Sequence, residues 1–297
     1  HIDAAESAFF ERQIEYVKSQ TYDIKYADLK ARMMVPTSTE VNAGATSVTY
    51  EQWDEVGIAK IISANAKDVP RVDVKGTEFT RPVRLLGASY GWTVQDVKAA
   101  AMAGTNLNSR RAAACRRAIE RLLDEIACFG APLHGIATGA LNNASVTIDA
   151  SAGSWTAPAA ADTIILEVST MMQGIIDDSE GIEAPDTFVL PDQEWAHIAT
   201  TPRSTTSDTT ILEFIRRSFP GLTAIEPWHR LKEAGAGSVR RAWMYARRGD
   251  ILTHELPNDF EQLPVQEQGM EFVVHCMAAS AGTAVYYPLA MRYLDGI

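Results

Sequence analysis

Two strand-like segments, residues 47–62 and 77–90, constrain the fold more than any other part of the chain. Apolar residues alternate with polar and charged ones in both segments, which is typical of half-exposed strands. A ribbon with about 12 paired residues in each arm would reach roughly 40 Å. Because an isolated two-stranded ribbon is marginal in water, its apolar residues and unpaired edges need another surface. That surface belongs either to the body of the same chain or to a neighbouring chain. Pro82, in the second segment, is compatible with an exposed edge strand.

Composition limits the partners that the chain can have. Its 297 residues, 46% of them hydrophobic, are enough for one large domain or two closely joined ones. The 27 basic and 38 acidic residues give a net charge of −11. This charge excludes a partner recognised by overall attraction to phosphate or to an anionic membrane, although local basic patches are compatible with it.

Three cysteines, Cys115, Cys128 and Cys276, are spread over the chain. Their number and spacing fit neither a disulfide framework nor a metal-binding motif, and we expect a reducing compartment. No apolar run approaches the roughly 18 residues of a membrane span, and no signal-peptide pattern opens the sequence. The sequence therefore predicts a chain that does not interact with membranes.

The segments around the ribbon predict an arm and a long helix. Residues 1–46 are expected to form an arm, with a short amphipathic helix at 6–18 followed by extended chain. After the ribbon, Thr93 is a helix N-cap with Asp96 in the capping-box position. The helix is expected to falter at 104–108 and to continue to about 130. Its predicted buried stripe is Ala112, Cys115, Ile119, Leu122, Leu123 and Ile126.

The remaining sequence predicts an α/β unit and returning strands. A Gly- and Ala-rich stretch at 131–160, with a short strand at 146–148, marks a boundary. Beyond it, the patterns predict helices at 162–176, 193–199 and 210–217, a strand at 187–190, a hairpin of 222–231 with 239–247, and C-terminal strands at 271–277 and 283–293. The fold class is therefore α+β, divided into an arm (1–46), an extended hairpin loop (47–92), a helical unit (93–159), an α/β unit (160–262) and C-terminal strands (263–297).

One motif favours an enzyme. Residues 87–91, GASYG, match the G-x-S-x-G nucleophile elbow, with Ser89 as the nucleophile. The acid and the base that such a site also needs could be Asp250 and His275, which lie downstream. Three residues separate this serine from the helix cap, whereas the elbow leads directly into a helix. A serine hydrolase therefore stays as an alternative. The histidines lack metal-site spacing, and we predict no catalytic, cofactor or metal site.

Five arginine doublets, at 110–111, 116–117, 216–217, 240–241 and 247–248, are a further feature of the sequence. In a chain of net charge −11 we expect them to pair with carboxylates, within or between subunits, rather than to bind nucleic acid.

Several phrases of the sequence resemble one family. They are FFERQIEYVKSQTYDIKYADLKARMMVP, GIAKIISANAKDVPRVDVKG, GASYGWTVQDVKAAAMAG, TFVLPDQEW and YYPLAMRYLDGI. With the order of arm, ribbon, long helix, α/β unit and returning strands, the chain resembles the Hong Kong 97-type major capsid proteins of tailed bacteriophages. The resemblance covers nearly the whole chain.

The resemblance implies a role for each segment. Residues 1–46 would be the N-terminal arm, 47–92 the extended loop that lies on a neighbouring subunit, 93–159 the peripheral domain with its spine helix, 160–262 the axial domain, and 263–297 strands that return to the peripheral domain. The inter-subunit contacts expected in the arm and loop are Phe9, Phe10, Trp53, Lys60, Lys67, Arg71, Lys75 and Arg81. Loss of an N-terminal scaffolding segment to a maturation protease would account for a start at His1.

The function implied is that of a shell subunit, without cofactors, found in the virion capsid after assembly in the bacterial cytoplasm. Its partners would be copies of itself in pentamers and hexamers, a portal, a scaffold or maturation protease, decoration proteins, and packaged double-stranded DNA bound without sequence specificity. Some family members join a loop lysine to a neighbour's asparagine. Since no residue here identifies that asparagine, we predict a shell without this crosslink. An encapsulin-like nanocompartment, which packages an enzyme instead of a genome, is the second alternative.

Overall fold

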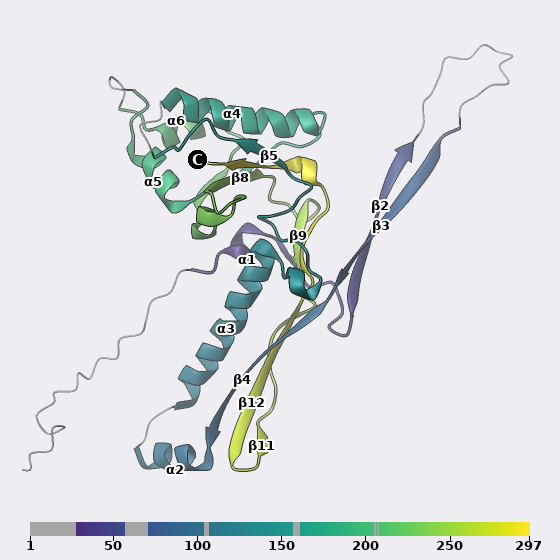
Figure 1. Ribbon diagram of the computed structural model, residues 1–297, viewed down its shortest axis with the longest axis vertical. Helices are drawn as coiled ribbons and strands as arrows, with labels where there is room; N and C mark the ends of the chain where they lie inside the picture. The colour runs from purple at the N-terminus through teal and green to yellow at the C-terminus, as the bar shows by residue number, and fades with distance from the viewer. Residues whose placement is uncertain (1–27, 57–70, 104–106, 157–160, 205, 207) are drawn as a thin grey trace, which may run out of the picture.

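The computed structural model describes residues 28–56, 71–103, 107–156, 161–204, 206 and 208–297. The described chain is elongated (Figure 1). An α/β unit lies at one end, a long helix and a long sheet run away from it, and a two-stranded ribbon projects to the side. The predicted arm helix at 6–18, most of the polar tip and residues 104–106 of the predicted helix break lie outside the described residues. The other two residues of that predicted break, 107 and 108, belong to a helix.

The α/β unit is built on a five-stranded sheet with the order β5-β14-β8-β6-β7. Its strands are β5 (Thr147–Ala150), β14 (Met291–Asp295), β8 (Arg241–Tyr245), β6 (Thr187–Leu190) and β7 (Ala224–Pro227). The strand β6 and the helices α4 (Ala161–Asp178), α5 (Asp192–Thr200) and α6 (Ile211–Ser218) agree closely with the predicted elements. The unit thus contains the elements with the clearest local patterns.

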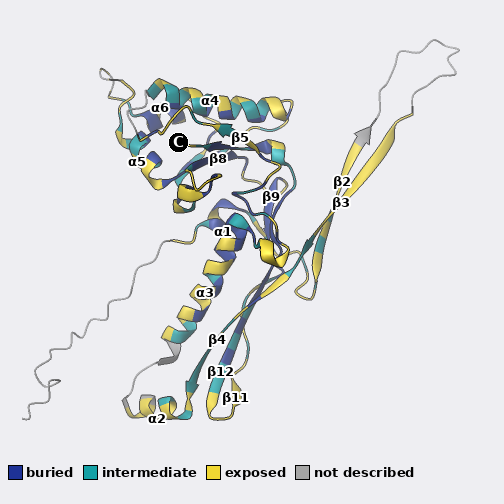
Figure 2. Cartoon of the chain, in the orientation of Figure 1, coloured by how far each residue is buried: buried dark blue, intermediate teal, exposed yellow. Residues whose placement is uncertain are grey.

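The strands β6 and β8 are buried on both faces of this sheet, which is why they read as nearly continuous apolar runs. On one face, Phe188, Met244 and Leu294 pack against α4 and α6. On the other face, Trp243 and Tyr293 pack with the end of the long helix and with the 3₁₀ helix at His229–Glu233. Figure 2 shows the resulting dark core of the α/β unit.

Three predictions about strand partners are wrong. Segments 222–231 and 239–247 form no hairpin, because β7 pairs in parallel with β6 while β8 lies between β6 and β14. The C-terminal strands do not all return to the peripheral side, since β14 sits inside the α/β sheet. Strand β5, placed by the sequence in the 93–159 unit, pairs with β14 in that same sheet. Strand partners are set by tertiary packing, which local patterns do not carry.

The long helix α3 (Leu107–Phe129) covers one face of a long antiparallel pair, β4 (Arg84–Thr93) and β12 (Glu271–Ser280). The strands β10 (Asn258–Gln262) and β11 (Gln266–Gln268) pair with the other edge of β12, although the sequence placed 258–262 in the α/β unit. The predicted capping box is confirmed: Thr93 Oγ1 accepts from Asp96 N (3.1 Å), and Thr93 N donates to Asp96 Oδ2 (3.3 Å), at the start of α2 (Val94–Ala103). Of the predicted stripe, Leu122 is exposed.

The ribbon consists of β2 (Ser47–Val56) and β3 (Asp73–Pro82), paired over ten residues on each strand. The predicted second arm therefore ends at Pro82, and the rest of it turns into β4 of the long sheet. Proline has no N–H to continue the ladder. The next N–H, of Val83, donates to Thr46 O (2.9 Å), which closes the ribbon at its root. The predicted loop boundary at residue 92 is thus about ten residues too far along the chain.

A small three-stranded sheet joins these parts. It has the order β1-β9-β13, with β1 (Thr37–Ser38), β9 (Leu252–Glu255) and β13 (Gly282–Val285). The short helix α1 (Ala31–Met34) precedes β1 and packs on α3 and on the sheet core. Among the described residues, no helix combines the length and the apolar character needed to cross a bilayer.

Candidate functional site

The ribbon has two different faces, because side chains alternate along each strand. Thr49 and Thr80 mark the first face, where their hydroxyl oxygens lie 2.9 Å apart. Next along this face, Glu51 lies directly opposite Glu78. Trp53 follows, 63% exposed, and its ring lies across Gly76, where an added Cβ would come within 2.9 Å of it.

We call Glu51, Glu78 and Trp53 the acidic face of the ribbon. Like charges directly opposite one another on a strand pair are destabilising. No described residue forms an ion pair with either glutamate. The acidic face is therefore open to a cationic partner outside the described part of this chain.

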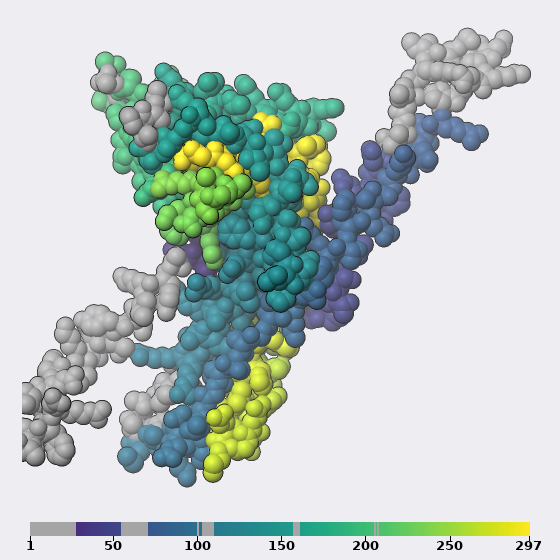
Figure 3. Space-filling model, in the orientation of Figure 1, coloured from purple at the N-terminus to yellow at the C-terminus, as the bar shows by residue number. Residues whose placement is uncertain are grey.

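The second face of the ribbon fixes it to the body. Near the root, Tyr50 stacks on Phe79 with ring centroids 5.1 Å apart, and Tyr286 meets Tyr50 edge-on at 4.9 Å. Tyr286 donates to Glu255 Oε1 (2.9 Å), and burial raises the pKa of its hydroxyl. Arg81 donates to Thr283 O (2.5 Å). These contacts fix the root of the ribbon to the body, and the outer part of β2 and β3 projects away from it (Figure 3).

The structure places four of the eight predicted contact residues. Trp53, Arg71 and Lys75 are exposed along the ribbon, as contact residues would be. Arg81 is half-buried at the root and binds its own chain, and burial lowers the pKa of its guanidinium. Phe9, Phe10, Lys60 and Lys67 lie outside the described residues. Sequence reasoning missed the aromatic root because Tyr286 is distant in the chain, although the alternation of Tyr50 and Phe79 was a signal for their shared face.

A basic stripe runs along the outer side of α3. Arg110, Arg117 and Arg121 are exposed and stand seven and four residues apart, which places them on one helix face. The opposite face of α3 carries Cys115, Ile119, Leu123 and Ile126 against the long sheet. We call these three arginines the α3 stripe. It is a local basic patch, which is compatible with the negative net charge of the whole chain.

The predicted pairing of arginine doublets with carboxylates is confirmed for three of them. Arg111 lies 3.7 Å from Asp96, both Arg240 and Arg241 pair with carboxylates, and Arg248 lies 2.7 Å from Glu183. Arg241 is the most buried of these: it contacts both oxygens of Asp295 at 2.6 and 2.7 Å and lies over the Tyr293 ring. These arginines fasten the protein's own elements together.

The structure does not support an elbow at Ser89. This serine lies within strand β4, opposite His275 on β12, and the next helix begins only at Val94. Asp250 pairs with Arg248 in another part of the chain. A nucleophile elbow needs a sharp strand-to-helix turn at the serine, and β4 runs straight through this position.

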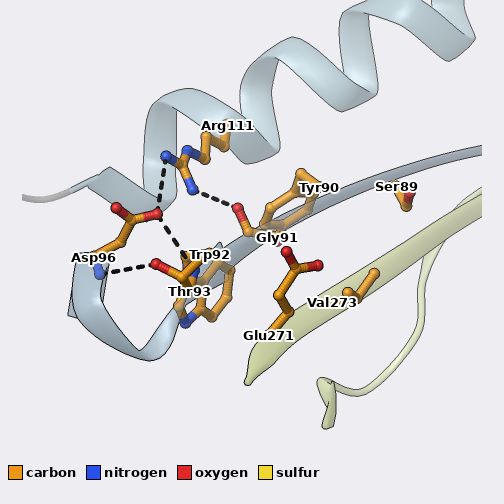
Figure 4. Close-up of a pocket in the computed structure, with 9 residues that line it drawn as sticks. All are labelled: Ser89, Tyr90, Gly91, Trp92, Thr93, Asp96, Arg111, Glu271 and Val273. Atoms are coloured by element: carbon orange, nitrogen blue, oxygen red, sulfur yellow. Dashed lines mark hydrogen bonds and ion pairs between the residues drawn. The ribbon is translucent and has the colours of Figure 1, made fainter. Parts of the chain in front are cut away.

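An open cavity of about 410 Å³ does lie beside Ser89, at the far end of the long sheet (Figure 4). Three of its polar side chains are engaged in structural contacts. Arg111 donates to Gly91 O and pairs with Asp96, which in turn caps α2 with Thr93. Among the described residues, no cluster of three or more His, Cys, Asp or Glu could hold a metal ion. The ribbon is therefore the stronger candidate for function.

The comparison with protein families decides the affiliation. The family model for the major capsid protein matches residues 57–297. The chain belongs to the major capsid protein family. No curated protein matches it at a significant level.

Solved structures agree with this family. The capsid of Myoviridae phage XM1 is 20% identical, covers 98% of this chain and 100% of its own, and gives a TM-score of 0.85. The capsid of a native GTA particle covers 99% of both chains at 12% identity and a TM-score of 0.64. A virus-like particle from Pyrococcus furiosus, at 15% identity, covers 88% of this chain and 90% of its own with a TM-score of 0.52. The predicted resemblance to bacteriophage major capsid proteins of the Hong Kong 97-type fold is confirmed.

Proposed function

We propose that this capsid protein assembles with copies of itself into the icosahedral head of a tailed bacteriophage and encloses its double-stranded DNA. The observation that supports this most is the ribbon. Ten residues on each strand project from the body, and nearly all of β3 is exposed. An isolated two-stranded ribbon gains too little from its own packing to be stable in water. A neighbouring subunit would supply the missing surface.

The contact with a neighbour would join two different surfaces. The acidic face offers two carboxylates and an indole ring, and the α3 stripe offers the guanidinium groups of Arg110 and Arg121 on another side of the molecule. The exposed alanines Ala113, Ala114 and Ala118 lie beside these arginines and leave room for Trp53. A contact between unlike surfaces is head-to-tail, and it closes into rings when the rotation allows. Pentamers and hexamers are such rings.

The domain roles follow the same proposal. The α/β unit would be the axial domain, while α3 and the long sheet would form the peripheral domain. Many weak contacts made at once give a closed shell its stability. The net charge of −11 suits a container, because a wall that does not hold phosphate lets packed DNA move. Membership in a structural family supports a role without catalysis.

The remaining partners are proposed on the resemblance alone. They are a portal, a scaffold or maturation protease, and decoration proteins, with assembly in the bacterial cytoplasm. The shell is proposed to lack the lysine–asparagine crosslink. The loop offers Lys60, Lys67 and Lys75 for such a crosslink. Of these, Lys75 is described, and it stands exposed on β3 opposite Asp54.

Electron microscopy of the purified full-length protein tests the proposal. Discrete icosahedral particles are expected, and a uniform monomer or dimer under all assembly conditions would contradict it. Particles taken from infected cells should contain DNA. A specific cargo protein without DNA would instead identify a nanocompartment, and an esterase activity abolished by Ser89→Ala would identify a hydrolase.

On a denaturing gel the subunits should run as intact 32.4 kDa monomers. A ladder of covalent multimers would overturn the prediction on crosslinking.

A further inference from the structure

Two of the three cysteines lie in the same buried cluster between the long helix and the long sheet. Cys115 on α3 is 6% exposed, and Cys276 on β12 is 1% exposed. Both belong to the same buried cluster. Burial, followed by the proximity of Cys276, raises the pKa of the Cys115 thiol to about 11.

The surroundings bring these two thiols together. Cys276 faces α3 together with Val274 and Ala278, which alternate with it along β12. The residue directly opposite Cys276 on β4 is Ala88, whose small side chain leaves room beside the sulfur. Ile119, one turn after Cys115, packs into the same cluster. Both side chains thus lie in one apolar cluster, Cys115 from the helix side and Cys276 from the sheet side.

Cys128 provides a contrast inside the same chain. It lies at the end of α3, fully buried, in the separate core of the α/β unit. Burial raises the pKa of its thiol as well. The two cores place Cys128 apart from the other two cysteines, so the chain contains one thiol pair and one single thiol.

We propose that Cys115 and Cys276 form an oxidation site, at which an intrachain disulfide links α3 to β12 while Cys128 stays a thiol. This inference concerns the folded subunit and does not depend on the proposed function. Under that function, the subunit passes from a reducing cytoplasm to the medium outside the cell, where a disulfide persists.

A peroxide can carry out this oxidation. The thiolate of one cysteine attacks a peroxide oxygen, an S–O bond forms, the O–O bond breaks, and one water leaves with the thiol proton. The second thiol then attacks the sulfenic sulfur, the S–S bond forms, the S–O bond breaks, and a second water leaves. Two thiols and one hydrogen peroxide thus give one disulfide and two waters, and two electrons pass from sulfur to peroxide.

Hydrogen peroxide with the folded full-length protein tests the proposal. After oxidation, the protein is unfolded and alkylated, and its intact mass gives the number of free thiols. This number should fall from three to one, and peptide mapping should find Cys115 joined to Cys276. Because the thiolate is the reactive form, the rate should rise about tenfold for each pH unit below 11. Three alkylated thiols after exhaustive oxidation, or separate sulfinic acids without a link, would overturn the proposal.

Variants separate the pair from the single thiol. Cys128→Ala should form the same bond and leave no free thiol, whereas Cys115→Ala and Cys276→Ala should each keep two free thiols. The oxidised wild type should melt about 5 °C above its reduced form, because a bridge across a long loop restricts the unfolded chain. The variants Cys115→Ala and Cys276→Ala should melt at one temperature with or without peroxide. A bond that forms in Cys115→Ala would show that the pair is assigned wrongly.

Discussion

The five-stranded sheet and the ribbon are both made of short, regular strands, yet they bury their residues in opposite ways. All five residues of β8 are buried, including Arg241, whose charge is paired with Asp295. In β3, eight of ten residues are exposed, and a pair of glutamates faces each other without a counter-charge among the described residues. The α/β unit is completed by its own chain. The root of the ribbon packs on the body, and its outer part is exposed, where we propose that a neighbouring subunit binds.

The largest expected effect comes from the core of the α/β unit. Phe188 is fully buried on β6 and lies beside Trp155. Phe188→Ala should reduce the free energy of unfolding of the subunit by about 4 kcal/mol, since it removes contacts and leaves a cavity. Urea unfolding of the dissociated subunit measures this. A decrease of less than about 1 kcal/mol in the free energy of unfolding would mean that the α/β unit is not stabilised by its own core. The unit would then not differ from the ribbon in this respect.

Gly139 tests the joint between α3 and the α/β unit. A Cβ at this position would lie 2.4 Å from the backbone carbon of Cys128, and the loop is held there by Asn142, which bonds both Gly139 N (2.7 Å) and Phe129 O (2.9 Å). Backbone atoms cannot move aside as a flexible side chain can. Gly139→Ala should therefore reduce the free energy of unfolding by about 3 kcal/mol. Gly153→Ala is the matched control, because no atom lies within 4 Å of its added Cβ.

His254 tests the joint between the arm strand β1 and the body through its response to pH. Burial, with the nearby Arg32 as a second cause, lowers the pKa of His254 to about 4, below the 6.5 of an exposed histidine. Between these two pKa values His254 is protonated in the unfolded chain and neutral in the folded chain. The free energy of unfolding therefore falls as the pH falls. The free energy of unfolding should decrease by about 2 kcal/mol from pH 6.5 to pH 5.

The variant His254→Asn isolates this effect, since all other histidines stay in place. Glu120 and Asp124 line the same small cavity and are present in both proteins. The difference in slope between wild type and variant therefore belongs to His254. Equal slopes in urea unfolding at the two pH values would contradict the assignment.

The smallest effect on the subunit is expected in the ribbon, together with a large effect on assembly. Glu51→Lys places a lysine opposite Glu78 and replaces a repulsive pair by an attractive one, so the free energy of unfolding should rise by about 0.5 kcal/mol. Particle yield in the electron microscope should nevertheless fall at least about tenfold, because the acidic face loses its match to a cationic neighbour.

Two further variants sharpen this result. Asp177→Lys, an exposed reversal on α4, should leave particle yield unchanged. Combining Glu51→Lys with Arg121→Glu should restore particles if the α3 stripe is the partner of the acidic face. Normal assembly of Glu51→Lys alone would show that the acidic face makes no contact in the shell.

Local patterns predicted the elements that depend on neighbouring residues. The helix α4, the strand β6 and the capping box at Thr93 all follow from periodicity or from capping chemistry, which residues a few positions apart decide. The ribbon was predicted for the same reason. Leu122 shows the limit of this reasoning, because it lies one position from the buried stripe of α3 and faces solvent.

Partners that are distant in the chain could not be predicted in this way. Segment 222–231 has a strand pattern, but Trp228 and Leu231 leave the strand to enter the core under the sheet. Arg81 looked like a charge on an exposed ribbon until Thr283 and Tyr286 were brought beside it. In both cases the position of the residue is set by contacts with residues that are distant in the sequence, and the local pattern does not indicate these contacts.

The position of β14 has a consequence for synthesis. This strand enters the middle of the five-stranded sheet, between β5 and β8, with Tyr293 and Leu294 buried on its two faces. Strand β5 emerges from the ribosome long before β14, and it has no partner strand until β14 has been translated up to residue 295. The sheet therefore closes late, and a chain interrupted before that point lacks a finished α/β unit. Incomplete copies would be excluded from a growing particle because they lack this folded unit, and no separate quality-control factor would be needed.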